Sequence, residues 1–263
     1  MGLPSSEYVR SELRDGVLEV VLDRPDRLNA LIGESFDCLT ELATRAAVDE
    51  GVRCVLLWAT GRAFSVGDDL SGQGDRHGVP ESDVTGTLAS YTVPTAALLR
   101  LRKPTVVALQ GPVYGGALEM ALACDFRIAD ESVTLGPVYA QHGFASGTTL
   151  LPLFVGYARA KRILLRGEAI SAEEASALGL VDDVVEGVEG AVTRARQLAQ
   201  QMANGPTTAY ALIKSALLQG IGRGPLEALH AEEDAGLASV RTQDAIEAER
   251  AFAEKRSPKF LGR

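Results

Sequence analysis

The chain has 263 residues, of which 46% are hydrophobic, 23% charged and 5% aromatic, a composition typical of a globular domain with a large core. Its net charge of −9, with no basic stripe or stacking-aromatic motif, argues against a nucleic-acid partner. No apolar run reaches about 18 residues, so no membrane span is expected. Three widely spaced cysteines without a C-x-x-C motif (Cys38, Cys54, Cys124) predict reduced core residues in a cytoplasmic protein.

Strand-like runs and helical patterns alternate along the first 200 residues. Residues 8–13 and 17–22 are predicted strands, and Asp15-Gly16 between them is a strong hairpin signal. An amphipathic helix is expected over 34–48, because its apolar residues recur at helical spacing. The apolar run 52–58 is typical of a strand buried on both faces. A polar, glycine-rich segment at 71–87 predicts a mobile loop or a short helix over a site.

The middle of the chain repeats this order. A helical pattern ends at Lys103-Pro104 and a second buried strand follows. The predicted elements are a helix at 95–102, a strand at 105–109, a buried helix at 116–124, and short strands at 126–129 and 133–135. Because the connections are too long for hairpins, we expect βα units with a mostly parallel sheet.

Helices dominate from about residue 147 onward. Ser171 is a good helix cap, Gly179 a plausible helix end, and 181–185 a last strand. The remaining predicted helices cover 191–203, 207–218 and 225–253. The chain is therefore predicted to divide into an α/β core over 1–200 and a helical region over 201–263.

Two glycine-containing turns carry the functional signal. The segments 63–70 (AFSVGDDL) and 111–119 (GPVYGGALE) each follow an apolar β-branched run and precede a helical pattern. Such turns leave backbone N–H groups directed outward. If the N–H groups of Asp68 and Gly116 converge on one oxygen, they form an oxyanion hole, which would stabilise the enolate form of a thioester.

Glu119 is the candidate acid or base. It lies three residues after Gly116, on the same face of the predicted helix, where its carboxylate would reach the carbons beside a bound carbonyl. The alternative is a residue that only stabilises the helix dipole. The order of the two turns and the carboxylate favours the functional interpretation.

The chain resembles the enoyl-CoA hydratase/isomerase, or crotonase, family over almost its whole length. The resemblance rests on segments 22–31 (LDRPDRLNAL), 64–70, 103–104, 111–119 with 123–125, and 251–260 (AFAEKRSPKF). It implies an α/β crotonase-like spiral of ββα repeats, a C-terminal helical trimerisation region, and trimers that often pair into hexamers. It also implies an acyl-CoA substrate, as in fatty acid metabolism, with coenzyme A entering as part of the substrate and no separate cofactor.

The same resemblance assigns individual positions. Asp68 and Gly116 match the oxyanion-hole donors, and Glu119 matches the first of the two catalytic glutamates of hydratases. Positions that line the CoA channel are matched by Arg27, Leu28, Ser65 and Val66, and the tail positions that touch CoA from a neighbouring subunit by Lys259 and Phe260.

One departure from the family pattern concerns the second hydratase glutamate. Tyr139 stands at that position, where it could hold the thioester, donate a proton, exclude water or simply pack. Efficient hydration is therefore in doubt, and isomerisation does not follow cleanly, since single-glutamate isomerases commonly keep the residue replaced here. We expect the Asp68 side chain to point away from the developing enolate, with Asp69 capping the next helix.

The leading hypothesis is an enoyl-CoA hydratase or double-bond isomerase that uses Asp68, Gly116, Glu119 and Tyr139. A decarboxylase of malonyl-type thioesters and a non-catalytic acyl-CoA-binding protein are the alternatives. A serine nucleophile at Ser65 is disfavoured, because no G-x-S-x-G elbow or nearby base is evident. The three histidines share no metal-binding spacing, so no metal is expected; they are His77, His142 and His230.

Overall fold

A mostly parallel sheet forms the centre of the computed structural model, which describes residues 3–72 and 91–263. Its strands are β1 (Val9–Arg14), β2 (Val17–Leu22), β3 (Cys54–Ala59), β4 (Thr105–Leu109), β6 (Phe126–Asp130) and β9 (Asp183–Val185), in the order β1-β2-β3-β4-β6-β9. Among these six described strands only the β1–β2 pair is antiparallel. Asp15 and Gly16 join it with positive φ at both residues, as the hairpin signal predicts. The expected mixed α/β fold with a central sheet is confirmed.

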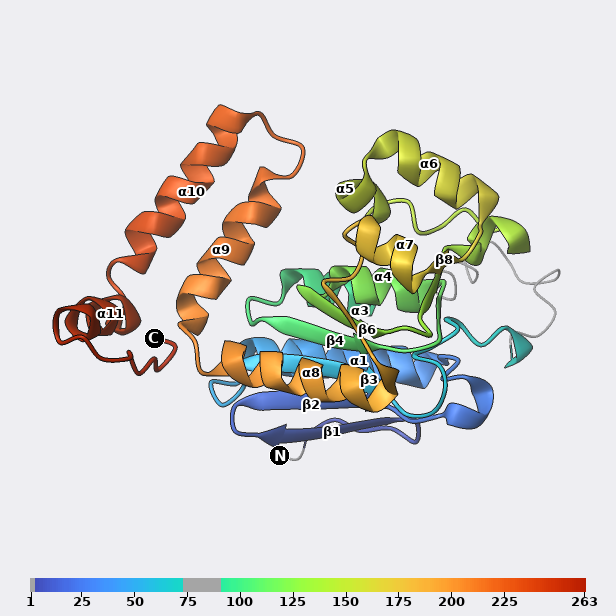
Figure 1. Cartoon of the computed structure of the whole chain (residues 1–263), viewed down its shortest axis with the longest axis horizontal. Helices are drawn as coiled ribbons and strands as arrows, with labels where there is room; N and C mark the ends of the chain where they lie inside the picture. Colours follow the sequence, from blue (N-terminus) through green and yellow to red (C-terminus); the bar gives the residue numbers. More distant parts are fainter. Residues whose placement is uncertain (1–2, 73–90) are drawn as a thin grey trace.

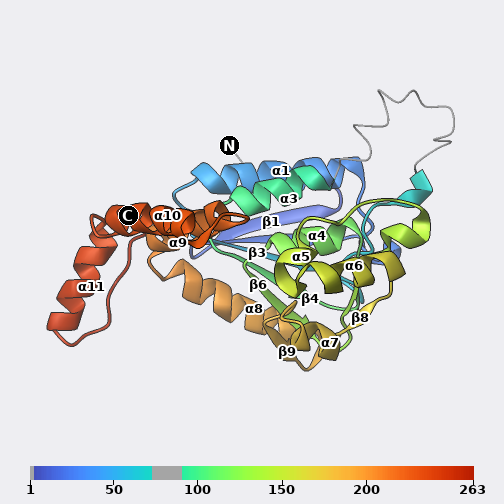
Figure 2. The ribbon, with the colours of Figure 1, turned by 90° about the horizontal axis from the view of Figure 1, so that it is seen from above.

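Both faces of the sheet are buried, which explains why its strands are continuous apolar runs. Successive residues of β3 and β4 alternate between two core clusters: Val55 and Val107 belong to one, and Leu56 and Val106 to the other. The first cluster packs beneath α1 (Gly33–Val48) and α4 (Gly116–Ala123), with α3 (Thr92–Arg100) alongside them. The second is covered by α8 (Gly187–Ala203), on the opposite face (Figure 2).

A small second sheet contains the short strand predicted at 133–135 and two strands that sequence analysis did not predict. It consists of β5 (Pro112–Tyr114), β7 (Thr134–Gly136) and β8 (Ile170–Ser171), with β5 and β7 parallel. β7 corresponds to the strand predicted at 133–135, whereas β5 lies inside the glycine turn segment 111–119 and β8 has only two residues, too few for a periodic signal. Because β4 leads into β5 and then α4, and β6 leads into β7 and then helices, the chain winds as successive ββα units.

Four shorter helices follow β7 in the chain. They are the 3-10 helix η4 (Val138–His142), α5 (Leu151–Val155), α6 (Tyr157–Arg166) and α7 (Ala172–Ala177). The Ser171 hydroxyl accepts a hydrogen bond from the Glu174 N–H at 3.2 Å, so the predicted cap of α7 is confirmed.

The C-terminal helices α9 (Thr207–Gly220), α10 (Pro225–Ser239) and α11 (Gln243–Ala253) extend away from the sheet (Figure 1). The expectation of helix throughout 225–253 is wrong between α10 and α11. Thr242 interrupts it, because its backbone is extended and its hydroxyl caps α11 by accepting from the Ala245 N–H at 3.1 Å. The last residues return to the core, where Arg53 donates to the carbonyls of Gly205 and Phe260.

The predicted loop at 71–87 falls largely outside the described residues, and so does His77. Its described beginning is the 3-10 helix η2 (Leu70–Gly72). Within the ranges 3–72 and 91–263, none of the helices is long and apolar enough to cross a membrane.

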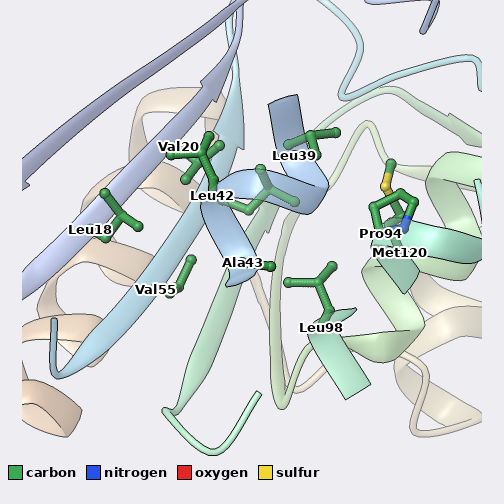
Figure 3. A pocket seen from close by; sticks show the side chains of 10 residues that line it. Leu18, Val20, Leu39, Leu42, Ala43, Val55, Pro94, Leu98 and Met120 are labelled. Carbon is green, nitrogen blue, oxygen red and sulfur yellow. The ribbon is translucent and has the colours of Figure 1, made fainter. Parts of the chain in front are cut away.

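A small apolar cavity of about 20 Å³ lies between α1, α3, α4 and strands β2 and β3 (Figure 3). Leu42 of α1 points into it and is fully buried. Replacing Leu42 by alanine is expected to destabilise the fold by about 2–5 kcal/mol, because it enlarges an existing void. Urea unfolding measures this, with Val48→Ala on the same helix as the control, since Val48 is 82% exposed. Equal losses in both variants would contradict the assigned core position.

Candidate active site

The first glycine turn lies beyond the carboxyl end of β3 and is held from two sides. Ser65 pairs with the β5 segment, donating its N–H to the Pro112 carbonyl and accepting from the Tyr114 N–H. On the other side, Leu31 donates to the Gly67 carbonyl and accepts from the Asp69 N–H, both at 2.8 Å. Asp68 lies between these two bonds, so its own N–H is directed away from Leu31.

The second glycine turn follows β5 and begins α4. Gly115 donates its N–H to the Gly136 carbonyl at 3.0 Å, which fixes the turn on β7. Gly116 is the first residue of α4, and its N–H has no hydrogen-bond acceptor within the described part of the chain. The positive end of the α4 dipole therefore coincides with a backbone donor that is available to a ligand.

The two turns lie in contact with each other. A β-carbon on Gly67 would lie 3.3 Å from the Gly116 nitrogen and 2.7 Å from the Tyr114 carbonyl oxygen. Gly67 also has φ +85°, a conformation that other residues rarely adopt, so the contact requires glycine. The fold thus brings together the two backbone segments that the oxyanion-hole hypothesis requires.

Glu119 lies one turn into α4, in the wall of a cavity of about 290 Å³. Its residue surface is only 4% exposed, and no hydrogen bond or ion pair to its carboxylate occurs among residues 3–72 and 91–263. Burial raises the pKa of Glu119 to about 7. A carboxyl with this pKa is present in both protonation states near neutral pH, so it can serve as an acid or as a base.

Tyr139 packs beside Glu119 and is 9% exposed. Its hydroxyl is buried without a hydrogen-bond partner among the described residues. Its ring lies 5.9 Å, centroid to centroid, from the ring of Tyr91. Burial, with smaller contributions from Tyr91, Glu119 and Asp68, raises the pKa of Tyr139, so its phenol stays protonated and cannot act as a base near neutral pH.

The side chains of Glu119 and Tyr139 both pack against Gly147. A β-carbon on Gly147 would lie 3.0 Å from the Glu119 Oε1 and 2.6 Å from the Tyr139 Cε2. Both side chains therefore pack directly against the glycine backbone. Sequence analysis missed Gly147 and Tyr91: the glycine in 145–148 (ASGT) is a weak turn signal, and Tyr91 follows the least patterned stretch of the chain.

The Asp68 side chain does not point away from the site, contrary to the sequence-based expectation. Its Oδ2 lies 3.1 Å from the position that a β-carbon on Gly116 would take. The neighbouring Asp69 makes the outward contacts instead. It accepts hydrogen bonds from Ser71, at the start of η2, and from Arg24 at 2.6 Å, and together they lower the pKa of Asp69 to about 2.

The four residues predicted to line a CoA channel lie close together. Arg27 ends the 3-10 helix η1 (Pro25–Arg27) and is exposed, and the following Leu28 accepts from the Val66 N–H at 3.1 Å. Ser65 is fully buried, donates its hydroxyl to the Asn29 carbonyl and accepts from the Gly67 N–H. Because the Ser65 hydroxyl already makes two internal hydrogen bonds, it is not available as a nucleophile.

Lys259 and Phe260 lie elsewhere in the chain. The Lys259 N–H donates to Glu247 of α11, and the Phe260 carbonyl accepts from Arg53, which precedes β3. They are therefore near the amino ends of the parallel strands, whereas the glycine turns follow the carboxyl ends (Figure 1). Within one chain these two residues are not brought to the site.

The histidines and cysteines of the described residues form no metal site. His142 and His230 are exposed, and the three cysteines are free and buried. Among the described residues, no group of three His, Cys, Asp or Glu side chains is placed to hold a metal ion. The described cavity wall contains hydroxyl and apolar side chains with Glu119, but no Lys, Arg or His.

Comparison with known proteins matches residues 12–263 to the family model described as enoyl-CoA hydratase/isomerase. The chain is 33% identical over 261 residues to the 1,2-epoxyphenylacetyl-CoA isomerase of Escherichia coli (98% of this chain, 99% of the relative). It is 34% identical over 260 residues to the (E)-benzylidenesuccinyl-CoA hydratase of Thauera aromatica (97% and 99%). The crystal structure of the enoyl-CoA hydratase from Bacillus anthracis superposes with a TM-score of 0.90 at 31% identity, covering 98% of this chain and 100% of that one.

Proposed function

Because the chain belongs to the enoyl-CoA hydratase/isomerase family, we propose that it is an acyl-CoA-processing enzyme that stabilises a thioester enolate. The observation that carries the proposal is the placement of Glu119. This buried carboxyl has no described partner and a pKa of about 7, and it lies one turn after an available N–H donor. Such a group beside a backbone donor suits proton transfer at a carbon next to a carbonyl.

In the proposed reaction, the N–H groups of Asp68 and Gly116 hold the thioester oxygen. Negative charge that develops on this oxygen is stabilised by both donors and by the α4 dipole, each donor contributing about 3–4 kcal/mol. Glu119 takes or returns the proton at the adjacent carbon. Arg27, Leu28 and Val66 would line the CoA channel, whereas Ser65 is fully buried and would only support this segment. No group other than the substrate's own CoA is needed.

Double-bond isomerisation and hydration make different demands on the site. Isomerisation needs one group that removes a proton from one carbon and returns it to another, which Glu119 alone can do. Hydration also needs an activated water, and the neutral phenol of Tyr139 does not provide a base. We therefore place isomerisation ahead of hydration.

Steady-state assays with crotonyl-CoA, a 3-enoyl-CoA and methylmalonyl-CoA test the proposal. We expect turnover of the 3-enoyl-CoA and slow or no hydration of crotonyl-CoA. Fast hydration of crotonyl-CoA would favour the hydratase assignment, and carbon dioxide release from methylmalonyl-CoA the decarboxylase alternative. CoA-ester binding without turnover of any substrate would indicate a non-catalytic family member.

Replacing Tyr139 by phenylalanine is expected to make the protein more stable but less active. The lost hydroxyl is buried without a described partner, so its removal should raise the free energy of unfolding by about 1 kcal/mol. If this hydroxyl binds the substrate, kcat/KM should fall about tenfold, corresponding to one lost hydrogen bond. Urea unfolding and steady-state kinetics measure both effects. An unchanged kcat/KM would assign Tyr139 to packing alone.

A homotrimer is the proposed assembly, with a dimer of trimers as the alternative. The support is the number of exposed large apolar side chains on α9 and α10 and at their ends, which include Ile213, Leu217, Ile221, Leu226, Leu237 and Val240. In a trimer, Lys259 and Phe260 could approach the site of a neighbouring subunit, as the family resemblance implies. Light scattering should give three or six times the 27.8 kDa chain mass. A cytoplasmic location stays a prediction, and three mammalian relatives are named as mitochondrial.

A further inference from the structure

The segment 143–150 joins η4, which carries Tyr139, to α5, and part of it forms one wall of the cavity at Glu119. Most of its residues are exposed or half-buried, but Gly147 is buried. Gly147 has φ +72°, and Gly143 at the start of the segment has φ +75°. Both glycines therefore hold a left-handed conformation that other residues rarely adopt.

The packing at Gly147 leaves no room for a side chain. A β-carbon there would lie 2.6 Å from the Tyr139 Cε2 and 3.0 Å from both the Tyr139 Cδ2 and the Glu119 Oε1. A β-carbon on Gly143 would meet nothing within 4 Å among the described residues. The two glycines thus share one backbone requirement, and of the two it is Gly147 whose added β-carbon would meet the candidate acid.

This contact affects how well the Glu119 carboxyl is protected from water. Every residue of α4 is buried, and Tyr139 is buried beside it, whereas the segment 143–150 is largely exposed. The exposed segment is therefore the part that must yield when a β-carbon is added at Gly147. Its outward movement would admit water to a carboxyl whose pKa is raised to about 7 by burial.

The ionisable groups around Glu119 come from three other elements. They are the phenol of Tyr139 in η4, the phenol of Tyr91 before α3, and the Asp68 carboxyl of the first glycine turn. Two further charged or titratable residues of η4 and α3 are exposed and do not line the cavity: His142 and Arg100. Of all these groups, only Tyr139 is among the atoms nearest to a β-carbon on Gly147.

From this packing we infer that Gly147 is a positioning residue: its missing side chain lets the segment 143–150 close onto Glu119, which holds the carboxyl in place and keeps water from it. The inference rests on the proposed function, because it takes Glu119 as the group that moves the proton. Gly147 acts through Glu119 and Tyr139, and not through a contact with the substrate.

Gly147→Ala tests the inference, with Gly143→Ala as the control for an alanine in the left-handed conformation. Displacement of the acid should lower kcat by about 10²-fold in Gly147→Ala, whereas Gly143→Ala should stay within a few-fold of wild type. The limb of the pH–rate profile that belongs to Glu119 should move to lower pH by about one pH unit or more, whichever protonation state is active. A merely structural defect would lower the rate without moving this limb.

A stability measurement follows the same carboxyl without any turnover. Wild type, Gly143→Ala and Gly147→Ala are each paired with the protein that also carries Glu119→Gln, and urea unfolding is measured from pH 4 to pH 8. Stability from the protonated carboxyl is fully present below its unfolded pKa of about 4.5 and is lost as pH rises to its folded pKa. The difference within a pair should change up to about pH 7 in wild type and Gly143→Ala, and stop changing at lower pH in Gly147→Ala.

Each outcome decides the inference. An end point near or above pH 7 in Gly147→Ala overturns it, and so does an equal loss of kcat in both alanine variants. If the wild-type protein turns over none of the assayed substrates, the proposed function fails, and the stability series still shows whether Gly147 keeps water from Glu119. If Gly147→Ala does not fold, the same series compares Tyr139→Leu with Tyr139→Leu/Gly147→Ala, in which the 2.6 Å contact with the tyrosine ring is absent.

Discussion

Replacing Glu119 by glutamine is expected to lower kcat by about 10³, the range typical of a positioned acid or base. Glutamine has nearly the same shape as glutamate and leaves the backbone donors of α4 unchanged. It cannot exchange a proton at neutral pH, so the chemical step loses the group that moves the proton. Steady-state kinetics with the best substrate from the assays measures the loss, and binding of an unreactive acyl-CoA should change little.

The same substitution should change the pH dependence of stability. The pKa of Glu119 is about 7 in the folded protein and about 4.5 when unfolded, so between these values the folded state binds more protons. Wild-type stability therefore falls as pH rises from about 4.5 to 7, and this loss is absent in the glutamine variant. Relative to wild type, the variant should gain about 3 kcal/mol between pH 4 and pH 8.

Glu189→Gln is the matched control for a role in the helix dipole. Glu189 also lies in the first turn of a helix, α8, but it is exposed. If Glu119 only stabilised the dipole, both variants would lose less than about 1 kcal/mol of stability and keep full activity. Full activity in Glu119→Gln would therefore remove the proposed proton transfer.

The elements that sequence analysis predicted best are those whose burial leaves a pattern. β3 and β4 are apolar along their length because helices cover both faces of the sheet, and the Asp15-Gly16 turn requires two positive φ angles. The glycine turns were visible for a related reason. A β-carbon on Gly67 would collide with the Tyr114 carbonyl, so the contact between the turns constrains the sequence.

Side-chain directions and tertiary contacts at the site left weaker signals. The sequence around Asp68 and Asp69 contains two adjacent carboxylates, and only the fold shows which one pairs with Arg24. Arg24 lies 45 positions away in the chain, and its pairing with Asp69 leaves Asp68 on the side of Gly116. Short-range patterns carry no information about such a contact.

Replacing Gly116 by alanine is expected to lower kcat/KM by about 10²–10³, the effect of losing one oxyanion-hole donor. The new β-carbon would lie 2.6 Å from the Tyr91 Cβ and 3.1 Å from the Asp68 Oδ2, so the turn, the tyrosine or the carboxylate must shift. A shift of either turn separates the two N–H groups that are proposed to hold one oxygen. Kinetics and acyl-CoA binding, measured together, should show a larger loss in kcat than in binding.

Gly33→Ala is the control, because Gly33 begins α1, is exposed, and has open space around its α-carbon. Alanine there should leave activity unchanged and stabilise the helix by up to about 1 kcal/mol. Gly116→Ala should be less stable than wild type, because the Tyr91 Cβ must move, so thermal unfolding first establishes that the variant is folded. A folded Gly116→Ala protein with wild-type kcat/KM would mean that the two turns do not act as a pair. Some group other than these two N–H donors would then have to make the α-carbon of the thioester acidic.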